Sequence, residues 1–197
     1  MRNIRKWVTL IKRRIWSDNN VLLLKKTKDC DASYKKTCVA TIKEVNRSNV
    51  SDCLQFEDES YLQTYIDMLD SGDSGQFGYY NGKCVFRRWA LKGQGKTISF
   101  AGQNIMQLRK DQVYFHYTLT TPEARGKGIH SYAIKLFDEK FKGYEKLALV
   151  VPSNTSSLIG YKRNGYEVCS NINVKYRFFV PKIEFKDCNR KEKYVNL

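Results

Sequence analysis

The order of the predicted elements indicates a mixed α/β fold, in which a mostly antiparallel sheet is flanked by helices. Helical patterns come early in the chain, aromatic and β-branched strand patterns follow from Gln76, and strands then alternate with helices. Apolar residues make up 42% of the 197 residues, which supports a buried core and excludes a disordered chain. No internal repeat is visible, so we expect a single domain over residues 1–197.

A basic amphipathic segment leads the chain, and we expect it to be a helix over residues 1–19. The apolar positions that recur at helical spacing are Ile4, Trp7, Val8, Ile11 and Ile15. The first 28 residues hold nine Lys or Arg and one acidic residue, within a net charge of +15 for the whole chain. Such a helix is too charged to span a bilayer and lacks the apolar stretch of a signal peptide.

The sequence allows two placements of this basic helix. Its apolar stripe packs on the domain, which is the interpretation that we favour, or residues 1–16 lie on an anionic membrane surface. We therefore expect a cytoplasmic protein, with a peripheral position at the inner face of the membrane as the alternative.

The segment up to residue 100 is expected to contain strands and helices in turn. A short apolar run at residues 21–24 predicts a buried strand, and residues 31–45 read as helical. A second helix is expected over 58–70, capped by Asp58. Asn81-Gly82 gives the strongest hairpin signal, and a further strand fits 97–100.

Strands and helices alternate regularly after residue 112. We expect a strand at 113–120, a helix at 127–141, a strand at 146–151, a helix at 154–163 and a strand at 166–180. The charged tail, residues 182–197, shows no convincing period and is expected to be partly ordered.

A glycine-rich turn runs from the strand that ends at Pro122 into the following helix. Backbone N–H groups at a helix start are unpaired, and glycine lets the backbone approach an anion closely. Gly126 and Gly128 lie in this turn, and Arg125 and Lys127 add positive charge. The turn therefore predicts a phosphate site, although the same residues also occur in plain turns.

A second strand is followed by a helix that carries Asn154 and Tyr161. These two residues are seven positions apart, so a helix places them on one face, and Gly165 ends that helix.

The two motifs together resemble the GCN5-related N-acetyltransferase superfamily. Its Arg/Gln-x-x-Gly-x-Gly/Ala pattern is matched by Arg125 and Gly128, with His130 at the last position. Its Asn…Tyr-x-x-x-Gly-Phe/Tyr pattern is matched by Asn154, Tyr161, Gly165 and Tyr166. The firm resemblance covers residues 113–166. It implies the acyl-CoA N-acyltransferase fold with a splayed sheet, and direct transfer of an acetyl group from acetyl-CoA to a primary amine.

The resemblance also implies roles for individual residues. The backbone of Thr118, Leu119 and Thr120 would bind the pantetheine arm. The pyrophosphate would lie on the N–H groups of Gly126, Lys127, Gly128, Ile129 and His130. Asn154 would hold the pantetheine region or merely cap its helix, and Tyr161 would protonate the departing thiolate or serve only as a core residue.

A base must take the proton of the attacking amine, and His116 is the candidate. Strand alternation places Tyr114, His116, Thr118 and Thr120 on one face. A packing role for the histidine stays open, and Glu57, Asp58 and Glu59 offer a carboxylate instead.

No metal site is predicted, because the six cysteines form no CxxC pair and only His116 and His130 are present. We expect reduced structural thiols. None of the cysteines lies in either motif, which disfavours an acyl-cysteine intermediate.

Two further interpretations are weaker. The run at residues 90–97 imitates a nucleotide P-loop, but a strand rather than a helix follows it, so we expect a hairpin loop. A nucleic-acid or anionic-surface binding module would suit the positive charge, but the surplus outside the first 28 residues is dispersed, so no nucleic-acid partner is expected.

The acceptor is not identified by any motif. The positive charge favours an anionic small-molecule amine, such as a nucleotide-linked amino sugar of surface-polysaccharide synthesis, with a protein or peptide amine as the alternative. The sequence does not indicate an oligomeric state.

Overall fold

The computed structural model describes residues 11–27 and 40–187. The strands are β1 Trp16–Lys26, β2 Thr41–Glu44, β3 Ser74–Tyr80, β4 Lys83–Lys92, β5 Thr97–Phe100, β6 Gln103–Gln107, β7 Gln112–Thr120, β8 Glu145–Val150, β9 Tyr166–Arg177 and β10 Val180–Asp187. The helices are α2 Glu59–Asp70, α3 Ile129–Lys140 and α4 Thr155–Arg163, with 3₁₀ turns η1 Val50–Gln55 and η2 Pro122–Ala124. No helix within the described ranges is long and apolar enough to cross a membrane.

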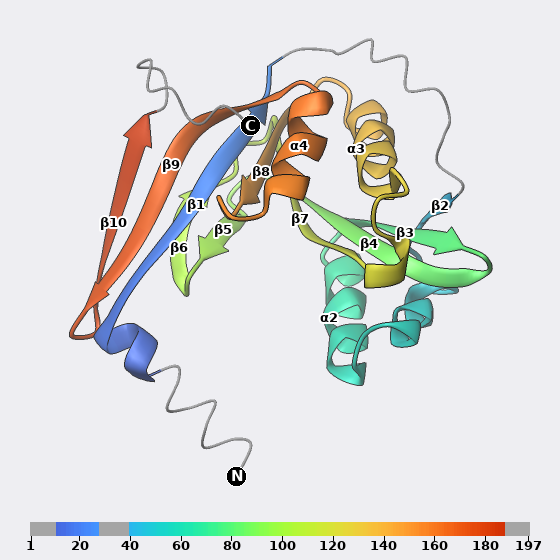
Figure 1. The fold of residues 1–197 in the computed structure, drawn as a ribbon, viewed down its shortest axis with the longest axis horizontal. Helices are drawn as coiled ribbons and strands as arrows, with labels where there is room; N and C mark the ends of the chain where they lie inside the picture. The colour runs from blue at the N-terminus through green and yellow to red at the C-terminus, as the bar shows by residue number, and fades with distance from the viewer. Residues whose placement is uncertain (1–10, 28–39, 188–197) are drawn as a thin grey trace.

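One eight-stranded sheet carries the fold, in the order β10-β9-β1-β8-β7-β4-β3-β2 (Figure 1). Every neighbouring pair in it is antiparallel except β7 and β8, which run parallel. The predicted mixed, mostly antiparallel sheet flanked by helices is confirmed. The parallel pair requires a crossover, and α3 supplies it between β7 and β8.

The helices lie on opposite faces of the sheet (Figure 1). On one face, Phe137 of α3 and Tyr161 of α4 pack against Phe115 of β7. We call this the α3/α4 face. On the other, Tyr65 of α2 packs against Trp89 of β4, and the β5–β6 hairpin covers the part of the sheet around β1 and β9. We call this the α2 face.

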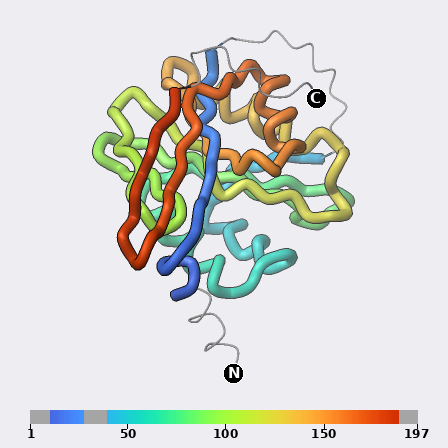
Figure 2. The backbone as a smooth tube through the Cα atoms, turned by 60° about the vertical axis from the view of Figure 1, so that its left-hand side comes forward, coloured from blue at the N-terminus to red at the C-terminus, as the bar shows by residue number. Residues whose placement is uncertain are grey.

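Three long strands from the two ends of the chain form one side of the molecule. Figure 2 shows β1, β9 and β10 running side by side. β1 begins at Trp16, earlier than the predicted strand, because it pairs with β9 over its whole length. The predicted helix over 1–19 therefore ends at Ile15; residues 11–15 are helical, and residues 1–10 lie outside the described ranges.

Two secondary-structure predictions are wrong in part. The helix expected over 31–45 is contradicted at 41–44, where β2 pairs with β3 as the edge of the sheet, while residues 31–39 are not described. The strand expected over 166–180 ends at Arg177, and residues 182–187, expected to be partly ordered, belong to β10 (Val180–Asp187) because β9 offers a free edge for pairing. Residues 188–197 are not described.

The hairpin predicted at Asn81-Gly82 is confirmed. Both residues have positive φ, 51° and 75°, and join β3 to β4. This is the conformation of a type I′ turn, for which Asn-Gly is the preferred sequence.

Candidate functional site

The parallel strands β7 and β8 separate part-way along their length. Their pairing runs from Gln112 opposite Glu145 to Phe115 opposite Ala148 and then stops, although β7 continues to Thr120. Beyond Phe115, β7 is paired only with β4. The backbone groups of Thr118 to Thr120 that face β8 are therefore not used by the strand ladder, as the sequence interpretation expected of a splayed sheet.

A β-bulge at Tyr117 lies at the point of separation. Arg87 is opposite Leu119 and Trp89 is opposite His116, so two residues of β7 face Arg88 alone. Tyr117 has a φ of 49°, which is uncommon for a residue other than glycine. The bulge interrupts the two-residue alternation, so the predicted common face of Tyr114, His116, Thr118 and Thr120 extends only from Tyr114 to His116.

The glycine-rich turn connects β7 to α3. Gly126 and Gly128 have φ of 74° and 72°, and a Cβ on either would meet no atom within 4 Å. α3 begins at Ile129, later than the predicted 127, because Gly128 is left-handed; its first hydrogen bond joins the Tyr132 amide to the Gly128 carbonyl. The N–H groups before it are thus open to an anion, with the exposed Arg125 beside them.

Tyr161 is buried at the α3/α4 face, and its hydroxyl contacts a buried arginine. Arg88 Nη2 donates to Tyr161 Oη over 2.9 Å. The guanidinium of Arg88 lies 4.6 Å from the ring centre of Phe115, and the Arg88 side chain is 0% exposed. Burial raises the pKa of Tyr161, while the charge of Arg88 opposes that rise.

Arg88 is only partly satisfied. Its Nε and Nη1 atoms are buried without a hydrogen-bond partner in the described part of the chain. A buried guanidinium with two unpaired nitrogens is costly, so its position needs an explanation beyond packing.

Asn154 lies at the start of α4, and His130 lies in the first turn of α3 beside Tyr161. Asn154 caps α4, because its Oδ1 atom accepts from the Ser157 amide over 3.2 Å. The ring of His130 lies edge-on to Tyr161, with 5.5 Å between ring centres, and a Cβ at Gly160 would approach His130 Nδ1 to 3.0 Å. The missing side chain of Gly160 is what admits His130 at this position.

His116 lies on the α2 face, opposite Tyr161. It stacks on Tyr114, with 5.3 Å between ring centres, and its Nε2 atom is buried without a partner in the structure as described. Burial, followed by the charges of Arg87 and Arg88, lowers the pKa of His116 to about 4. The imidazole is therefore neutral at pH 7.

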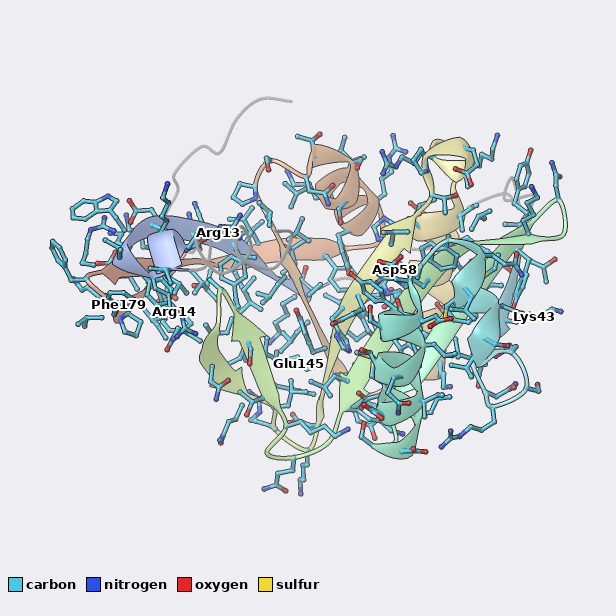
Figure 3. The ribbon with its side chains drawn as sticks, turned by 90° about the horizontal axis from the view of Figure 1, so that it is seen from below. Arg13, Arg14, Lys43, Asp58, Glu145 and Phe179 are labelled. Atoms are coloured by element: carbon cyan, nitrogen blue, oxygen red, sulfur yellow. The ribbon has the colours of Figure 1, made fainter. Side chains whose placement is uncertain are left out.

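An arginine and several tyrosines gather beside His116 on the α2 face. Arg87 Nε donates to Glu57 Oε1 over 2.6 Å, and its guanidinium lies 5.2 Å from the ring centre of Tyr117 and 5.5 Å from that of Tyr61. Through Arg87, Glu57 therefore lies close to the β-bulge at Tyr117. Asp58 is exposed at the start of α2, where Figure 3 labels it, and Glu59 is exposed in the first turn.

Several solved structures with a similar fold are GNAT-family acetyltransferases. A GNAT-family acetyltransferase from Colwellia psychrerythraea matches with a TM-score of 0.60 at 11% identity, over 88% of this chain and 61% of that one. The chain has the GNAT acetyltransferase fold.

Two further GNAT structures extend this comparison. A putative GNAT-family acetyltransferase from Novosphingobium aromaticivorans gives a TM-score of 0.55 at 12% identity, over 81% of this chain and 64% of that chain. A GCN5-related glucosamine N-acetyltransferase region of a fungal multi-domain GH3 β-N-acetylglucosaminidase gives 0.56 at 16% identity, over 88% of this chain and 23% of that chain. No protein-family model and no curated protein matches the chain. In the three structural comparisons, the chain spans less than two thirds of the length of each GNAT protein.

Within this GNAT fold, some of the predicted site residues come together. Tyr161 of α4 packs with Phe115 at the end of the β7–β8 pairing, and His130 at the start of α3 contacts Tyr161. His116 is separated from Tyr161 by the sheet itself, because neighbouring positions of β7 alternate between the two faces.

The other chemical predictions concern residues away from this region. Lys96, in the P-loop-like run, pairs with Asp73, and β5 follows it as predicted; the run joins β4 to a separate two-stranded sheet, so it is not a hairpin loop. Cys53 and Cys84 are free thiols, Cys169 Sγ donates to the Leu23 carbonyl over 3.3 Å, and burial raises the pKa of Cys84 to about 12. Among the described residues, no group of three His, Cys, Asp or Glu could hold a metal ion.

Sequence reasoning missed Arg88 and the pair of Arg87 with Glu57. One signal was available: two arginines interrupt the otherwise apolar and aromatic run from Val85 to Leu91, and charged residues are seldom placed in a buried strand without a role.

Proposed function

We propose that the protein is an acetyl-CoA-dependent N-acetyltransferase that moves an acetyl group directly to a primary amine. The observation that carries the proposal is the separation of β7 from β8 after Phe115, beside a glycine turn with open amides. A thioester with a diphosphate needs a slot for its extended arm and an anion site at the end of that slot, and these two features supply both.

The turn and the strand would hold the co-substrate. The amides of Gly126 to His130 suit the diphosphate, with Arg125 and Lys127 adding charge. The backbone groups of Thr118 to Thr120 that β8 leaves unpaired suit the pantetheine arm, and the N–H groups among them are oxyanion-type donors for the thioester carbonyl. The co-substrate itself supplies the activated acetyl group.

Tyr161 is the proposed acid. Its raised pKa keeps the hydroxyl protonated at neutral pH, and Arg88 donates to the oxygen, which leaves the hydroxyl proton available for a second acceptor. When that proton passes to the departing thiolate, the adjacent guanidinium of Arg88 stabilises the phenolate that remains.

His116 is the proposed base, on the opposite face. Its pKa of about 4 leaves the imidazole neutral at pH 7, so a lone pair is free for the amine proton, but the same shift makes the ring a weaker base than an exposed histidine. A C–N bond forms as the C–S bond breaks, the amine proton passes to His116 and the sulfur receives the proton of Tyr161. Acid and base on different faces fit two substrates that meet at a gap in the sheet.

We infer that the acceptor is an anionic amino sugar, such as a nucleotide-linked one used in surface-polysaccharide synthesis. The net charge of +15 favours an anionic partner. The amino-sugar part of the proposal is supported by a protein of similar fold that is named as a glucosamine N-acetyltransferase region. Mass spectrometry of products from amino sugars, nucleotide-linked amino sugars and peptides tests this inference; acetylation of peptides alone would contradict it.

Binding and turnover are tested separately. Acetyl-CoA at a hundredfold its dissociation constant should stabilise the protein by about 2.7 kcal/mol, a rise in Tm of roughly 5–10 °C. Tyr161→Phe should keep this thermal shift and lower kcat by about 10²-fold or more. An absent shift with the wild-type protein would contradict the proposed function, whereas an unchanged kcat would remove only Tyr161 from the mechanism.

A further inference from the structure

The turn between β9 and β10 exposes two phenylalanines in a strained backbone. Phe178 and Phe179 have φ of 48° and 67°, and their side chains are 74% and 56% exposed. Positive φ at both central residues is the type I′ conformation, which this chain builds from Asn81-Gly82 at the β3–β4 hairpin. Neither folding nor solubility favours Phe-Phe here, so the two side chains point to a contact outside the domain.

Further exposed apolar side chains lie beside this turn. Phe178 and Phe179 donate from their amides to the carbonyls of Ile15 and Arg14, over 2.7 and 2.8 Å, so the turn is bonded to the end of the 11–15 helix. The exposed apolar residues thus gathered, which we call the apolar tip, are Ile11 (47% exposed), Trp16 (62%), Phe178, Phe179 and Val180 (67%).

Basic residues surround the apolar tip. The segments 11–18 and 175–184 contain six Lys or Arg and two acidic residues, a surplus of +4. Both acids are paired, Asp18 with Arg177 and Glu184 with Lys175 and Lys182. Lys12, Arg13 and Arg14 are exposed, and Figure 3 shows Arg13, Arg14 and Phe179 together at one end of the molecule, with Asp58 well away from them.

The charge decides which partner suits the apolar tip. Aromatic and aliphatic side chains within a basic rim match an anionic lipid surface, where apolar insertion and attraction to the headgroups act together. A second copy of the chain would bring the same positive charge against itself. The adjacent edge strand β10 also carries Pro181, Lys182 and Lys186, which oppose pairing with another strand.

We propose that the apolar tip inserts into anionic membranes and holds the protein at their surface, with Lys12, Arg13 and Arg14 against the headgroups. The contact involves the β9–β10 turn and Trp16 as well as the basic helix, and it does not depend on the proposed acetyl transfer.

Flotation with lipid vesicles tests the proposal on the full chain. The protein should float with phosphatidylcholine vesicles that contain 30% phosphatidylserine, and should not float with phosphatidylcholine alone. Binding should weaken at least tenfold in 1 M NaCl, because salt screens the headgroup attraction. In a Trp7→Phe background, which leaves Trp16 and Trp89 of the three tryptophans, Trp16 fluorescence should shift to the blue on binding, whereas Trp89 is already 0% exposed and cannot report it.

The double variant Phe178→Asn, Phe179→Gly isolates the apolar tip. It installs the preferred type I′ sequence, so Tm should be unchanged or higher while vesicle affinity falls about tenfold or more. Phe185→Asn removes a 53% exposed phenylalanine elsewhere on β10 and should bind like the wild-type protein.

Charge and self-association give the remaining outcomes. Arg13→Glu with Arg14→Glu should abolish binding to anionic vesicles. Full vesicle binding by the Phe178→Asn, Phe179→Gly variant would overturn the proposal, because the basic helix alone would then account for the contact. A dimer in light scattering that dissociates in this variant, without vesicle binding by the wild-type protein, would overturn it in favour of a second copy.

Discussion

At the scale of single residues, Arg88 is a fully buried cation among aromatic rings. Its guanidinium lies among the rings of Phe115, Phe137 and Tyr161, and only one of its nitrogens has a partner. Replacing a buried charge by an apolar side chain of similar size is often neutral or stabilising. The buried position of Arg88 is therefore better explained by its hydrogen bond to the Tyr161 hydroxyl than by a contribution to stability.

Arg88→Met should separate activity from stability. Without a ligand, Tm should be unchanged or a few degrees higher, because two unpaired buried nitrogens are removed. We expect kcat to fall about tenfold or more, since the phenolate of Tyr161 loses its neighbouring cation. Thermal unfolding and steady-state kinetics check the two effects.

The pH profile of kcat distinguishes a positioning role for Arg88 from a structural one. Arg88 lowers the pKa of Tyr161, so the alkaline limb that reports loss of the tyrosine proton should move to higher pH in Arg88→Met. A variant that loses activity only in proportion to its folded fraction would contradict this role.

At the scale of elements, the turn before α3 depends on backbone conformation rather than on space. Gly126 and Gly128 have positive φ with no atom near a hypothetical Cβ, so glycine is needed there for φ alone. Gly82 in the β3–β4 hairpin has a φ of 75° and equally open surroundings. The two turns thus share the positive φ of their glycines, but only the turn before α3 belongs to the proposed diphosphate site.

Gly128→Ala and Gly82→Ala form a matched pair. Each should lower the free energy of unfolding by about 1 kcal/mol, because alanine is strained at positive φ. Only Gly128→Ala should also weaken acetyl-CoA binding, by about tenfold. The backbone of this turn would shift to relieve the strain of alanine at positive φ, and the shift would move the amides that face the diphosphate. Calorimetric titration and denaturant unfolding measure both quantities, and equal affinities would contradict an anion site in this turn.

At the scale of the whole molecule, the two histidines are buried on opposite faces of the sheet and are uncharged at neutral pH. Burial lowers the pKa of His116 on the α2 face to about 4 and that of His130 on the α3/α4 face to about 3, from 6.5 in an unfolded chain. Both contribute stability that is fully present above pH 6.5 and is lost as the pH falls toward these folded values.

Stability should therefore decline in a mildly acidic range. Between pH 7.5 and 5 the unfolded chain takes up protons on both histidines while the folded protein does not, which lowers the free energy of unfolding by about 2 kcal/mol for each. The double variant His116→Gln, His130→Gln should flatten the dependence of Tm on pH across this range. A wild-type slope retained in the variant would assign the effect to other groups.

The candidate site could be predicted from sequence only where it is local. Tyr161 and Asn154 share a helix, and the glycine turn follows its strand directly, so their spacing alone predicts a phosphate turn and a helix with a capped start. The loss of the common face of His116, Thr118 and Thr120 could not be predicted, because the bulge at Tyr117 depends on pairing with β4.

By itself the sequence determined the mixed sheet, the Asn81-Gly82 hairpin, the phosphate-type turn and the helix of Tyr161, because each arises from the conformational preferences of neighbouring residues. The tertiary structure alone decided that Arg88 meets Tyr161 across 73 residues, that β2 is a strand, and that Trp16 lies beside Phe178. These contacts form only when distant segments pair in one sheet, and no local preference encodes the register in which they do so.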